Sequence, residues 1–385
     1  MANLSFDNDD YSVIDKAAMV LAHNPVGLTL PGIDHVTHRE ATRLCARDYL
    51  ENHVFFNEHR FHNHLNHHLL AAFSMGASPA RLQRIFDINK PIQRPALVPC
   101  NDVTITPDNF TKYLSDESYY PNFVAFYRRE LAKSDDNWSA VVAHYAFHPD
   151  MFPLFMSGLL HPFIQLGYGL EFKSEAIIAT ALAQASVHQP QFARIFDRDT
   201  FDDICAANQD EDSSSIGLPL LAILDKLRND PLSKNVSYND NSYTDDNRAH
   251  AEALAIKYAK LWTIALPTDA SSIAAKCKEV MTVVALVYGA LTRPGYKPAL
   301  EFAFMHFLTS SYFIPIIFDA LPLVKQARLL RAYVASFLAL FVMKGCPPLY
   351  ITPELTSTNT HHHCTSTATT TTESSPDENC NPWMH

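Results

Sequence analysis

Apolar residues recur at helical spacing through nearly every long segment of this 385-residue chain. An apolar residue at every third or fourth position gives a helix one apolar face, whereas a half-buried strand alternates at every second position. The pattern predicts an all-α fold, and the 47% share of hydrophobic residues suffices for a large core. We expect a single helical bundle over residues 1–351 with a central cavity lined by aromatic and histidine side chains. The clearest segments are LLAAFSMGASPARLQRIF (69–86), SEAIIATALAQASVH (174–188), AHAEALAIKYAKLWTIAL (249–266) and AAKCKEVMTVVALVYGAL (274–291).

The sequence contains no glycine-rich loop of the kind that holds dinucleotides or nucleoside triphosphates. Neither GxGxxG nor GxxxxGK[ST] occurs, and glycine is scarce at 10 residues. A nicotinamide or flavin cofactor, if one is used, is therefore not held by a Rossmann motif. Lys and Arg number 30 against 41 Asp and Glu, for a net charge of -11. A phosphate backbone would meet no basic surface, so we expect no nucleic-acid partner.

Two features bear on the cellular compartment. The segment MANLSFDNDDYSVIDKAAM at the start of the sequence is acidic and lacks the basic and apolar regions of a secretory signal. The seven cysteines are widely spaced without a CxxC pair, which is typical of reduced thiols rather than of a disulfide or zinc framework. We therefore expect a cytoplasmic protein.

The most apolar run, AYVASFLALFVM, spans residues 332–343 between Arg331 and Lys344. It is shorter than the ~18 apolar residues that a membrane span needs. A buried helix is the better interpretation, and no membrane partner is expected.

Two polar regions interrupt the helical pattern. From Ala206 to Asn247, QDEDSSS and SYNDNSYTDDN flank LPLLAILDKL, which predicts mobile polar loops around one helix. From Thr352 to His385 the composition is of low complexity and predicts a disordered tail outside the fold. Three histidines of this tail could bind stray metal, although a solvated tail is the better explanation: His361, His362 and His363.

Histidines cluster in EHRFHNHLNHHLLAAFSMGA (58–77), which we expect to form a helix. With ~100° per residue, His64, His67 and His68 border its apolar face. His64 and His68 are four residues apart, a spacing at which two imidazoles can reach one ion or one substrate. A hydrogen-bonded or partly exposed pair would give the same pattern. The other histidines of the stretch, and His67, are expected to be packing or surface residues: His59, His62 and His67.

A second histidine-bearing stretch, HPDMFPLFMSGLLHPFIQLGYGLEF, covers residues 148–172. Pro162 suits the first turn of a helix, so we expect His161 at the helix entry, with Gln165 and Tyr168 on the following turns. Three glycines lower the local helix propensity, a cost that close packing against another element or a ligand could offset. A polar turn between helices would explain the same residues.

In a third stretch, EFAFMHFLTSSYFIPIIF (301–318), His306 stands among phenylalanines. An unpaired buried imidazole costs ~1–3 kcal/mol, so His306 needs a hydrogen-bond partner or a metal. Thr309 and Ser310 could supply the hydrogen bond. Alternatively, the three histidine-bearing helices could converge on one aromatic-lined cavity, which is then a candidate site.

The same three stretches resemble a known family. FHNHLNHHLLAAFSMGA, HPDMFPLFMSGLLHPFIQLGYGLEF and MHFLTSSYFIP, in this order and at these separations, resemble the questin oxidase-like family of fungal polyketide pathways. The resemblance extends over about residues 15–350, including LPLLAILDKLRNDP and RLLRAYVASFLALFVMKGCPPL. It implies an all-helical oxygenase, either a Baeyer-Villiger-type monooxygenase that uses NADPH or a ring-cleaving dioxygenase. The implied substrate is an aromatic polyketide of fungal secondary metabolism, such as an anthraquinone or a xanthone.

The resemblance also implies a metal site. One branch of the family holds iron through several histidines and a carboxylated lysine, and Fe(II) with O2 suits imidazole ligands. His64, His161 and His306 match that pattern as metal ligands. Two positions depart from it, because Gln165 stands where the family often has a histidine and Tyr333 stands in place of the lysine. These departures would weaken iron binding.

Further residues take roles through the same match. His68 would support proton transfer, while Gln165 and Tyr168 would orient the substrate. The candidate substrate contacts are Phe163, Thr309 and Phe313. The expected partner is a small aromatic polyketide, and the protein is expected to be a monomer or a homodimer.

Two other functions fit the same residues. A cofactor-free isomerase, cyclase or lyase could use His64 or His68 as a general base on an acidic phenol, and the two departures from the family pattern favour it. Such a redox-neutral reaction would proceed unchanged without oxygen. A helical carrier for an aromatic metabolite would instead bind it tightly and show no turnover under any cofactor condition.

Overall fold

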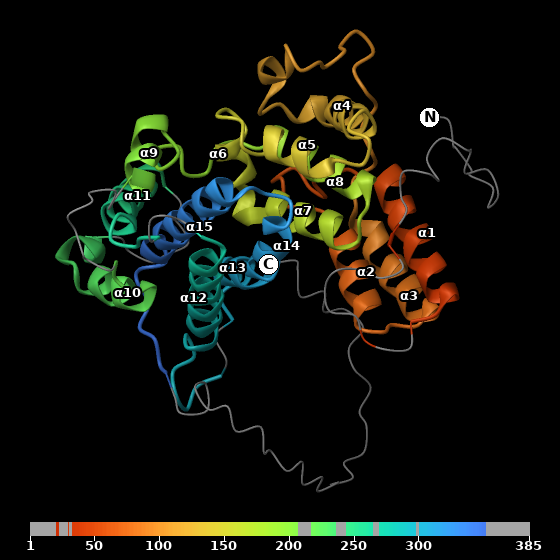
Figure 1. The fold of residues 1–385 in the computed structure, drawn as a ribbon. Helices are drawn as coiled ribbons and strands as arrows, with labels where there is room; N and C mark the ends of the chain where they lie inside the picture. The colour runs from red at the N-terminus through yellow and green to blue at the C-terminus, as the bar shows by residue number, and fades with distance from the viewer. Residues whose placement is uncertain are drawn as a thin grey trace, which may run out of the picture. The chain divides into compact units, whose positions relative to one another are not determined.

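The computed structural model describes residues 21–22, 30, 33–206, 217–235, 244–264, 269–297 and 300–351. Within these residues the chain forms fifteen α-helices and five short 3-10 helices, with no β-strand. The all-α fold predicted from helical periodicity is confirmed (Figure 1). Contacts divide the chain into residues 1–350 and 351–385. The 3-10 helices are η1 (Lys90–Ile92), η2 (Phe110–Tyr113), η3 (Glu117–Tyr119), η4 (Gly158–Leu160) and η5 (Pro231–Asn235).

The first three helices are α1 (His35–Glu51), α2 (Leu65–Ser74) and α3 (Pro79–Asn89). They pack around a second, smaller core, to which Phe172, Ala176 and Ile177 also belong. Asp34 and Ser78 begin α1 and α3, because their side-chain oxygens accept hydrogen bonds from backbone N–H groups of the first turn. The shared core includes Leu44, Leu69, Phe73 and Phe86.

Five helices follow: α4 (Tyr120–Ala132), α5 (Trp138–Tyr145), α6 (Phe152–Phe155), α7 (His161–Glu171) and α8 (Glu175–Ser186). Helix α8 contacts the other four, and all its residues from Ala176 to Ser186 are buried. Helix α7 approaches it closely at Gly169, where a Cβ atom would lie 2.8 Å from the backbone nitrogen of Ile178. Only glycine permits that approach.

The remaining helices surround the long last one: α9 (Arg198–Ala206), α10 (Leu220–Asn229), α11 (Asp245–Ala259), α12 (Ala270–Gly289), α13 (Phe302–Ser311), α14 (Ile314–Phe318) and α15 (Leu323–Met343). Helices α11 and α12 pack on α15, while α13 and α14 contact α7. The helix predicted in LPLLAILDKL is confirmed as α10.

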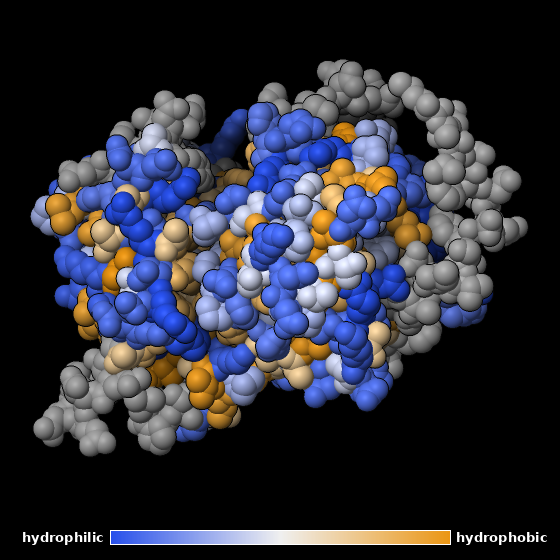
Figure 2. Space-filling view, turned by 90° about the horizontal axis from the view of Figure 1, so that it is seen from above, coloured by the Kyte–Doolittle hydropathy of each residue, from blue (hydrophilic) through white to orange (hydrophobic). Residues whose placement is uncertain are grey.

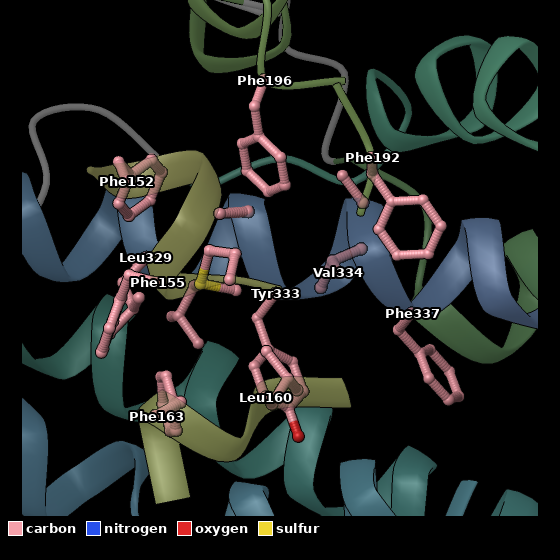
Figure 3. Close-up of a cluster of buried hydrophobic side chains, with 14 of the residues drawn as sticks. Phe152, Phe155, Leu160, Phe163, Phe192, Phe196, Leu329, Tyr333, Val334 and Phe337 are labelled. Atoms are coloured by element: carbon pink, nitrogen blue, oxygen red, sulfur yellow. The ribbon is translucent and has the colours of Figure 1, made fainter. Parts of the chain in front are cut away.

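Helix α15 is the core helix predicted from its apolar run. Every residue from Leu329 to Met343 is buried, and Figure 3 shows Val334 and Phe337 within the main hydrophobic cluster. By length and hydropathy alone α15 could cross a membrane, but 83% of its most apolar window is buried inside the fold. Hydrophilic residues cover most of the face in Figure 2, with hydrophobic residues in small groups between them.

The start of α2 differs from the prediction. The helix begins at Leu65 with His64 at its N-terminal cap, so residues 59–63 precede it and His62 lies in an isolated antiparallel bridge. Asn63 explains the difference. Its Oδ1 accepts from the Leu65 N–H at 2.9 Å and its amide donates to the buried carboxylate of Asp48 at 2.8 Å, which turns the chain into the helix.

Several predictions fall on residues that the structure does not describe. They include most of the predicted polar loops, residues 207–216 and 236–243, and the predicted tail from Thr352 to His385. The single domain over residues 1–351 stays a prediction.

Candidate functional site

Three histidines from different parts of the chain meet where α2, α7 and α13 come together. One ring nitrogen from each of His64, His161 and His306 lies within 4.8 Å of the other two. His64 caps α2, His161 begins α7 beside Pro162, and His306 lies on the second turn of α13. The predicted helix entry at His161 is confirmed. The three residues proposed as metal ligands thus share one location, which we call the histidine centre.

Backbone carbonyls orient two of these rings. His161 Nδ1 donates to the Gly158 carbonyl oxygen at 2.6 Å, and His306 Nδ1 donates to that of Phe302 at 2.7 Å. Because a carbonyl oxygen only accepts, each Nδ1 carries a proton and each neutral ring presents a bare Nε2 lone pair. The Nε2 atom of His64 lies 2.8 Å from that of His161. Metal-ligating histidines are held in the same way, through a hydrogen bond from the other ring nitrogen.

A left-handed turn positions His161. Gly158, Leu159 and Leu160 have φ values of 58°, 49° and 65°. Each such residue other than glycine costs ~1–3 kcal/mol and persists only where surrounding contacts require it. Here the turn directs the Gly158 carbonyl toward His161 Nδ1. Glycine is needed at 158 because a Cβ atom would lie 2.2 Å from Nε2 of His188.

Desolvation keeps the histidine centre uncharged. It lowers the pKa of the buried His306 to about 4 and that of the buried His161 well below its ordinary value. The surrounding protein also desolvates the His64 imidazole and lowers its pKa to about 4, although part of this side chain is exposed to solvent. Neighbouring imidazoles lower the pKa values of His64 and His161 further. At neutral pH all three rings are therefore neutral nitrogen ligands. The group contains no carboxylate among the described residues, so a divalent cation bound there would keep its full charge.

Two further histidines lie against the centre. The ring of His62 stacks on that of His161 with centroids 3.7 Å apart, and its Nε2 lies 2.8 Å from Nε2 of His188. His188 donates through Nδ1 to the carbonyl oxygen of Gln184 at 2.5 Å. Sequence reasoning treated His62 as a packing or surface residue and did not single out His188. The available signal was a histidine directly after the apolar segment that forms α8.

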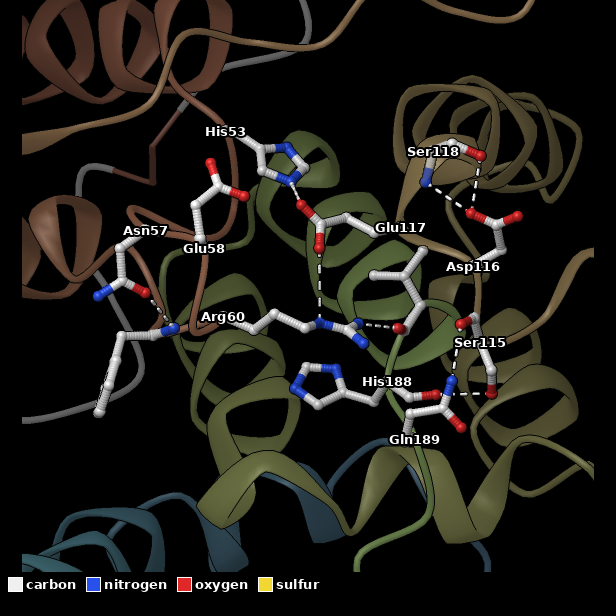
Figure 4. A network of polar contacts seen from close by, with 12 residues as sticks. His53, Asn57, Glu58, Arg60, Ser115, Asp116, Glu117, Ser118, His188 and Gln189 are labelled. Atoms are coloured by element: carbon white, nitrogen blue, oxygen red, sulfur yellow. Dashed lines mark hydrogen bonds and ion pairs between the residues drawn. The ribbon is translucent and has the colours of Figure 1, made fainter.

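A polar network fastens the segment before α2 to the end of α8 (Figure 4). Arg60 donates to the carbonyl oxygen of Val187 and lies 3.5 Å from the Glu117 carboxylate. Glu117 also accepts from Nε2 of His53 at 2.9 Å. Since Val187 precedes His188, the network joins the segment before α2, which carries His62, to the segment after α8, which carries His188.

Comparison with known proteins assigns the chain to a family. The model of the questin oxidase-like family matches residues 61–383. Oxidoreductase AflY of Aspergillus parasiticus is 30% identical over 347 residues, which are 83% of this chain and 67% of the relative. Baeyer-Villiger oxidase mdpL of Emericella nidulans is 30% identical over 320 residues (77% and 66%), and Questin oxidase of Aspergillus fumigatus is 29% identical over 283 residues (70% and 62%). The chain belongs to the questin oxidase-like family.

The family predicted from three motifs is therefore confirmed, and the relatives bear names of the oxidoreductase class that the sequence led us to expect. The chain spans about two thirds, or somewhat less, of the length of these relatives. The matched region begins at Phe61 and so includes all three residues of the histidine centre.

In this questin oxidase-like chain Gln165 is a fixed partner of His67. Its Oε1 accepts from Nε2 of His67 at 2.7 Å, and its Nε2 donates to Oγ1 of Thr180 at 3.0 Å. The Thr180 hydroxyl donates to the Ile177 carbonyl and must accept from Gln165, which fixes the orientation of the amide. Burial lowers the pKa of His67 to about 3. Gln165 thereby holds a neutral His67 edge-on to His64, with ring centroids 5.8 Å apart.

Tyr333, at the position of the lysine that the resemblance implies, is bonded within the hydrophobic core. Its hydroxyl donates to the Phe307 carbonyl at 2.6 Å and lies 2.8 Å from Oγ of Ser310. Its ring lies beside Phe163 (Figure 3). Burial raises the pKa of the Tyr333 hydroxyl, which therefore stays protonated.

Tyr168, predicted to orient the substrate, lies beside His67, and the predicted substrate contact Phe313 lies beside Tyr168, whereas Phe163 lies elsewhere. The Tyr168 ring is 5.2 Å from that of His67 and 4.6 Å from that of Phe313. Phe313 fits against Gly167, where a Cβ atom would lie 2.2 Å from its ring. Phe163 is fully buried in the main hydrophobic cluster.

His68 and Thr309 lie on exposed helix faces. His68 is outside the histidine centre, and Thr309 donates to the Met305 carbonyl at 3.0 Å. The alternative in which Thr309 or Ser310 supplies the hydrogen bond to the His306 ring does not hold, because His306 Nδ1 donates to the Phe302 carbonyl. Hydroxyls on a helix reach the carbonyls of the preceding turn, and both residues bond to such carbonyls.

Proposed function

We propose that this protein is an oxidoreductase of fungal secondary metabolism that inserts oxygen into, or cleaves a ring of, an aromatic polyketide ketone or quinone. Family membership supports the proposal, because relatives are named Baeyer-Villiger oxidase and Questin oxidase. The observation that carries it is the convergence of three neutral imidazoles, those of His64, His161 and His306, with ring nitrogens within 4.8 Å of one another.

The donor set fits a divalent transition metal such as Fe(II). Three imidazole nitrogens leave coordination positions open, and because the Nδ1 atoms of His161 and His306 bond to carbonyls, the Nε2 atoms of both rings are the nitrogens that would face a metal. A bound ion would replace the 2.8 Å contact between Nε2 of His161 and Nε2 of His64. When bound, the ion would supply O2 activation and polarise a substrate carbonyl. His64, His161 and His306 would hold it.

Other side chains would bind and orient the substrate. His64 is exposed whereas His161 and His306 are buried, so a substrate reaches the centre on the side of His64. The rings of Tyr168 and Phe313 offer aromatic faces for a planar polyketide near His67. His68, exposed on the next turn of α2, would pass a phenol proton to solvent.

Electron balance separates the two oxygenase reactions. A Baeyer-Villiger insertion places one oxygen atom of O2 in the substrate and releases the other as water, which takes two electrons and two protons. We assign the electrons to NADPH, which would bind without a Rossmann loop. A dioxygenase that cleaves the ring places both oxygen atoms in the product and consumes no reductant.

Metal content is the first test. The untagged full chain, with His361, His362 and His363 changed to alanine, would be loaded anaerobically with Fe(II) and freed of excess ion. We expect about one iron per chain, lost in His161→Ala and His306→Ala, together with iron-dependent O2 uptake in the presence of an anthraquinone substrate. Full O2-dependent turnover in either alanine variant would contradict the assignment.

A redox-neutral isomerase, cyclase or lyase is the second candidate. One observation favours it, since Gln165 is bonded to His67 and Tyr333 to Phe307, so neither supplies a ligand to the histidine centre. His64 would then be the general base. Unchanged turnover by metal-free protein without O2 and NADPH would select this function.

A further inference from the structure

A small polar cavity of about 40 Å³ lies beside Gln165. Its walls come from α1, α2, α4, α7, α8 and the segment after α1, and they include no member of the histidine centre. Nothing in the proposed oxygenase chemistry uses this cavity.

Three of the residues that line the cavity each have a buried side-chain atom with no hydrogen-bond partner in the protein. These atoms are Nδ1 of His53, Oδ1 of Asn66 and Oε1 of Gln184, in side chains that are 0%, 7% and 2% exposed. Buried polar atoms without partners are rare, because each forfeits the hydrogen bonds it would make to water. Three of them, from three separate elements around one cavity, point to a ligand bound between them.

The ligand must donate hydrogen bonds. The amide oxygens of Asn66 and Gln184 only accept. His53 uses its Nε2–H toward the Glu117 carboxylate at 2.9 Å, and burial lowers its pKa, so the ring is neutral with a bare Nδ1. The carboxylate of Asp48 also lines the cavity. The lining therefore offers acceptors to a guest that can donate in several directions.

The volume of the cavity and the charges around it limit which ligand can bind there. At ~10–15 Å³ per molecule, the cavity has room for about three water molecules and is far too small for an organic substrate. A cation is disfavoured because Asp48 is already compensated. Its carboxylate accepts from the amides of Asn52 and Asn63, and Lys90 donates to Asn52 at 2.9 Å.

We infer that this cavity is a binding site for two or three ordered water molecules that join His53, Asn66 and Gln184. Two waters offer four O–H donors, enough for the three acceptors and Asp48. The water site ties the segment before α2 to α2 itself and to α8. His62 lies in the segment before α2, His64 caps α2, and His188 follows α8 by two residues. The site therefore supports the histidine centre by water instead of by direct contact.

The sign of a stability change tests the inference. Gln184→Met and Asn66→Leu keep the approximate size of each side chain and replace the amide, including its unpartnered oxygen, by an apolar group. If water occupies the site, each change leaves a water donor unpaired and the melting temperature falls. If the site is dry, each change removes an unpaired polar atom and the melting temperature rises, which would overturn the inference.

Ser336→Ala is the matched control. Ser336 Oγ is also buried without a partner but does not line this cavity. Its removal should leave the melting temperature unchanged or raise it.

A high-resolution crystal structure of the full chain gives the second measurement. Water within hydrogen-bond distance of His53 Nδ1, Asn66 Oδ1 and Gln184 Oε1 supports the inference. An empty cavity, side chains turned to pair with one another, or a rubidium peak after a soak would overturn it. Neither measurement depends on enzymatic activity, so both are independent of the proposed function.

Discussion

At the scale of single residues, position 158 requires glycine for two reasons. Its φ is positive, and its Cα lies so close to the His188 imidazole that a Cβ atom would not fit. Gly158→Ala would place a Cβ atom 2.2 Å from Nε2 of His188 and displace the carbonyl that orients His161. We expect a loss of ~2 kcal/mol or more in unfolding free energy and at least ~10-fold weaker Zn(II) binding. Denaturant unfolding and zinc titration measure the two effects.

Gly295→Ala is the control for this prediction. Gly295 also has a positive φ, of 83°, but a Cβ atom there meets nothing within 4 Å. Gly295→Ala should lower the unfolding free energy by ~1 kcal/mol, the cost of the backbone conformation alone, without a change in zinc affinity. Equal losses in the two variants would show that the approach to His188 does not constrain residue 158.

Tyr333→Phe tests whether the hydroxyl belongs to the core or to the histidine centre. The change removes the bonds to Phe307 and Ser310 and keeps the ring. We expect a loss of ~1–2 kcal/mol in unfolding free energy and unchanged zinc affinity. A tenfold weaker affinity for zinc would instead place the hydroxyl among the groups that hold the metal.

Individual site residues were predictable where local chemistry restricts them. Pro162 marked the helix entry at His161, and a histidine among phenylalanines marked His306. The pairing of His62 with His188 was not predictable, because a contact between residues 126 positions apart leaves no trace in the spacing of either segment.

At the scale of elements, helical periodicity located the body of α2 but not its start. Leu65 and Leu69 are buried, as expected for apolar residues four positions apart on one helix face. Phe61, four residues before Leu65, would share that face in a longer helix but is 47% exposed outside it. The helix starts at Leu65 because Asn63 bonds to Asp48 on α1. That tertiary contact overrides a local sequence compatible with an earlier start.

The contact between α7 and Phe313, at the N-terminus of α14, gives an element-scale prediction. Gly167→Ala would raise helix propensity by ~1 kcal/mol, but its Cβ atom would lie 2.2 Å from the Phe313 ring. Overpacking costs ~1–3 kcal/mol, and the rigid ring also contacts Tyr168, so we expect net destabilisation of ~1–2 kcal/mol.

A double-mutant cycle measures this coupling. Phe313→Ala makes room for the added methyl group, so the double variant should be more stable than the sum of the two single changes predicts, by ~1 kcal/mol or more. Additive losses in denaturant unfolding would mean that α7 accommodates the methyl group without moving Phe313.

At the scale of the whole molecule, the all-α class followed from periodicity and the family from three motifs. The packing of α11 on α15 and of α8 against its four neighbours could not be predicted from the sequence, because alanine-rich helix faces fit many partners. The histidine centre lies between these two cases. Each residue was visible in the sequence, while the distances that make them a site depend on how α2, α7 and α13 meet.

The buried neutral histidines make the stability of the whole molecule depend on pH. Desolvation by the folded chain lowers the pKa of His67 to about 3 and those of His64, His188 and His306 to about 4, whereas an unfolded histidine titrates near 6.5. Between about pH 6.5 and pH 4 the unfolded chain binds more protons, so the unfolding free energy falls as the pH decreases. Carboxyl groups whose pKa burial raises, those of Asp48 and Glu171, stabilise the fold at low pH and lose that contribution as the pH rises.

His188→Gln measures the contribution of a single histidine to this pH dependence. At pH 5 the unfolded chain protonates His188 and the folded chain does not, so the variant should lose about 1.4 kcal/mol per pH unit from the slope of unfolding free energy against pH. Denaturant unfolding of the unchanged chain and of the variant at several pH values measures the difference in slope. An unchanged slope in His188→Gln would mean that the folded chain carries the proton, so that the 2.8 Å contact between His188 and His62 would join a charged ring to a neutral one.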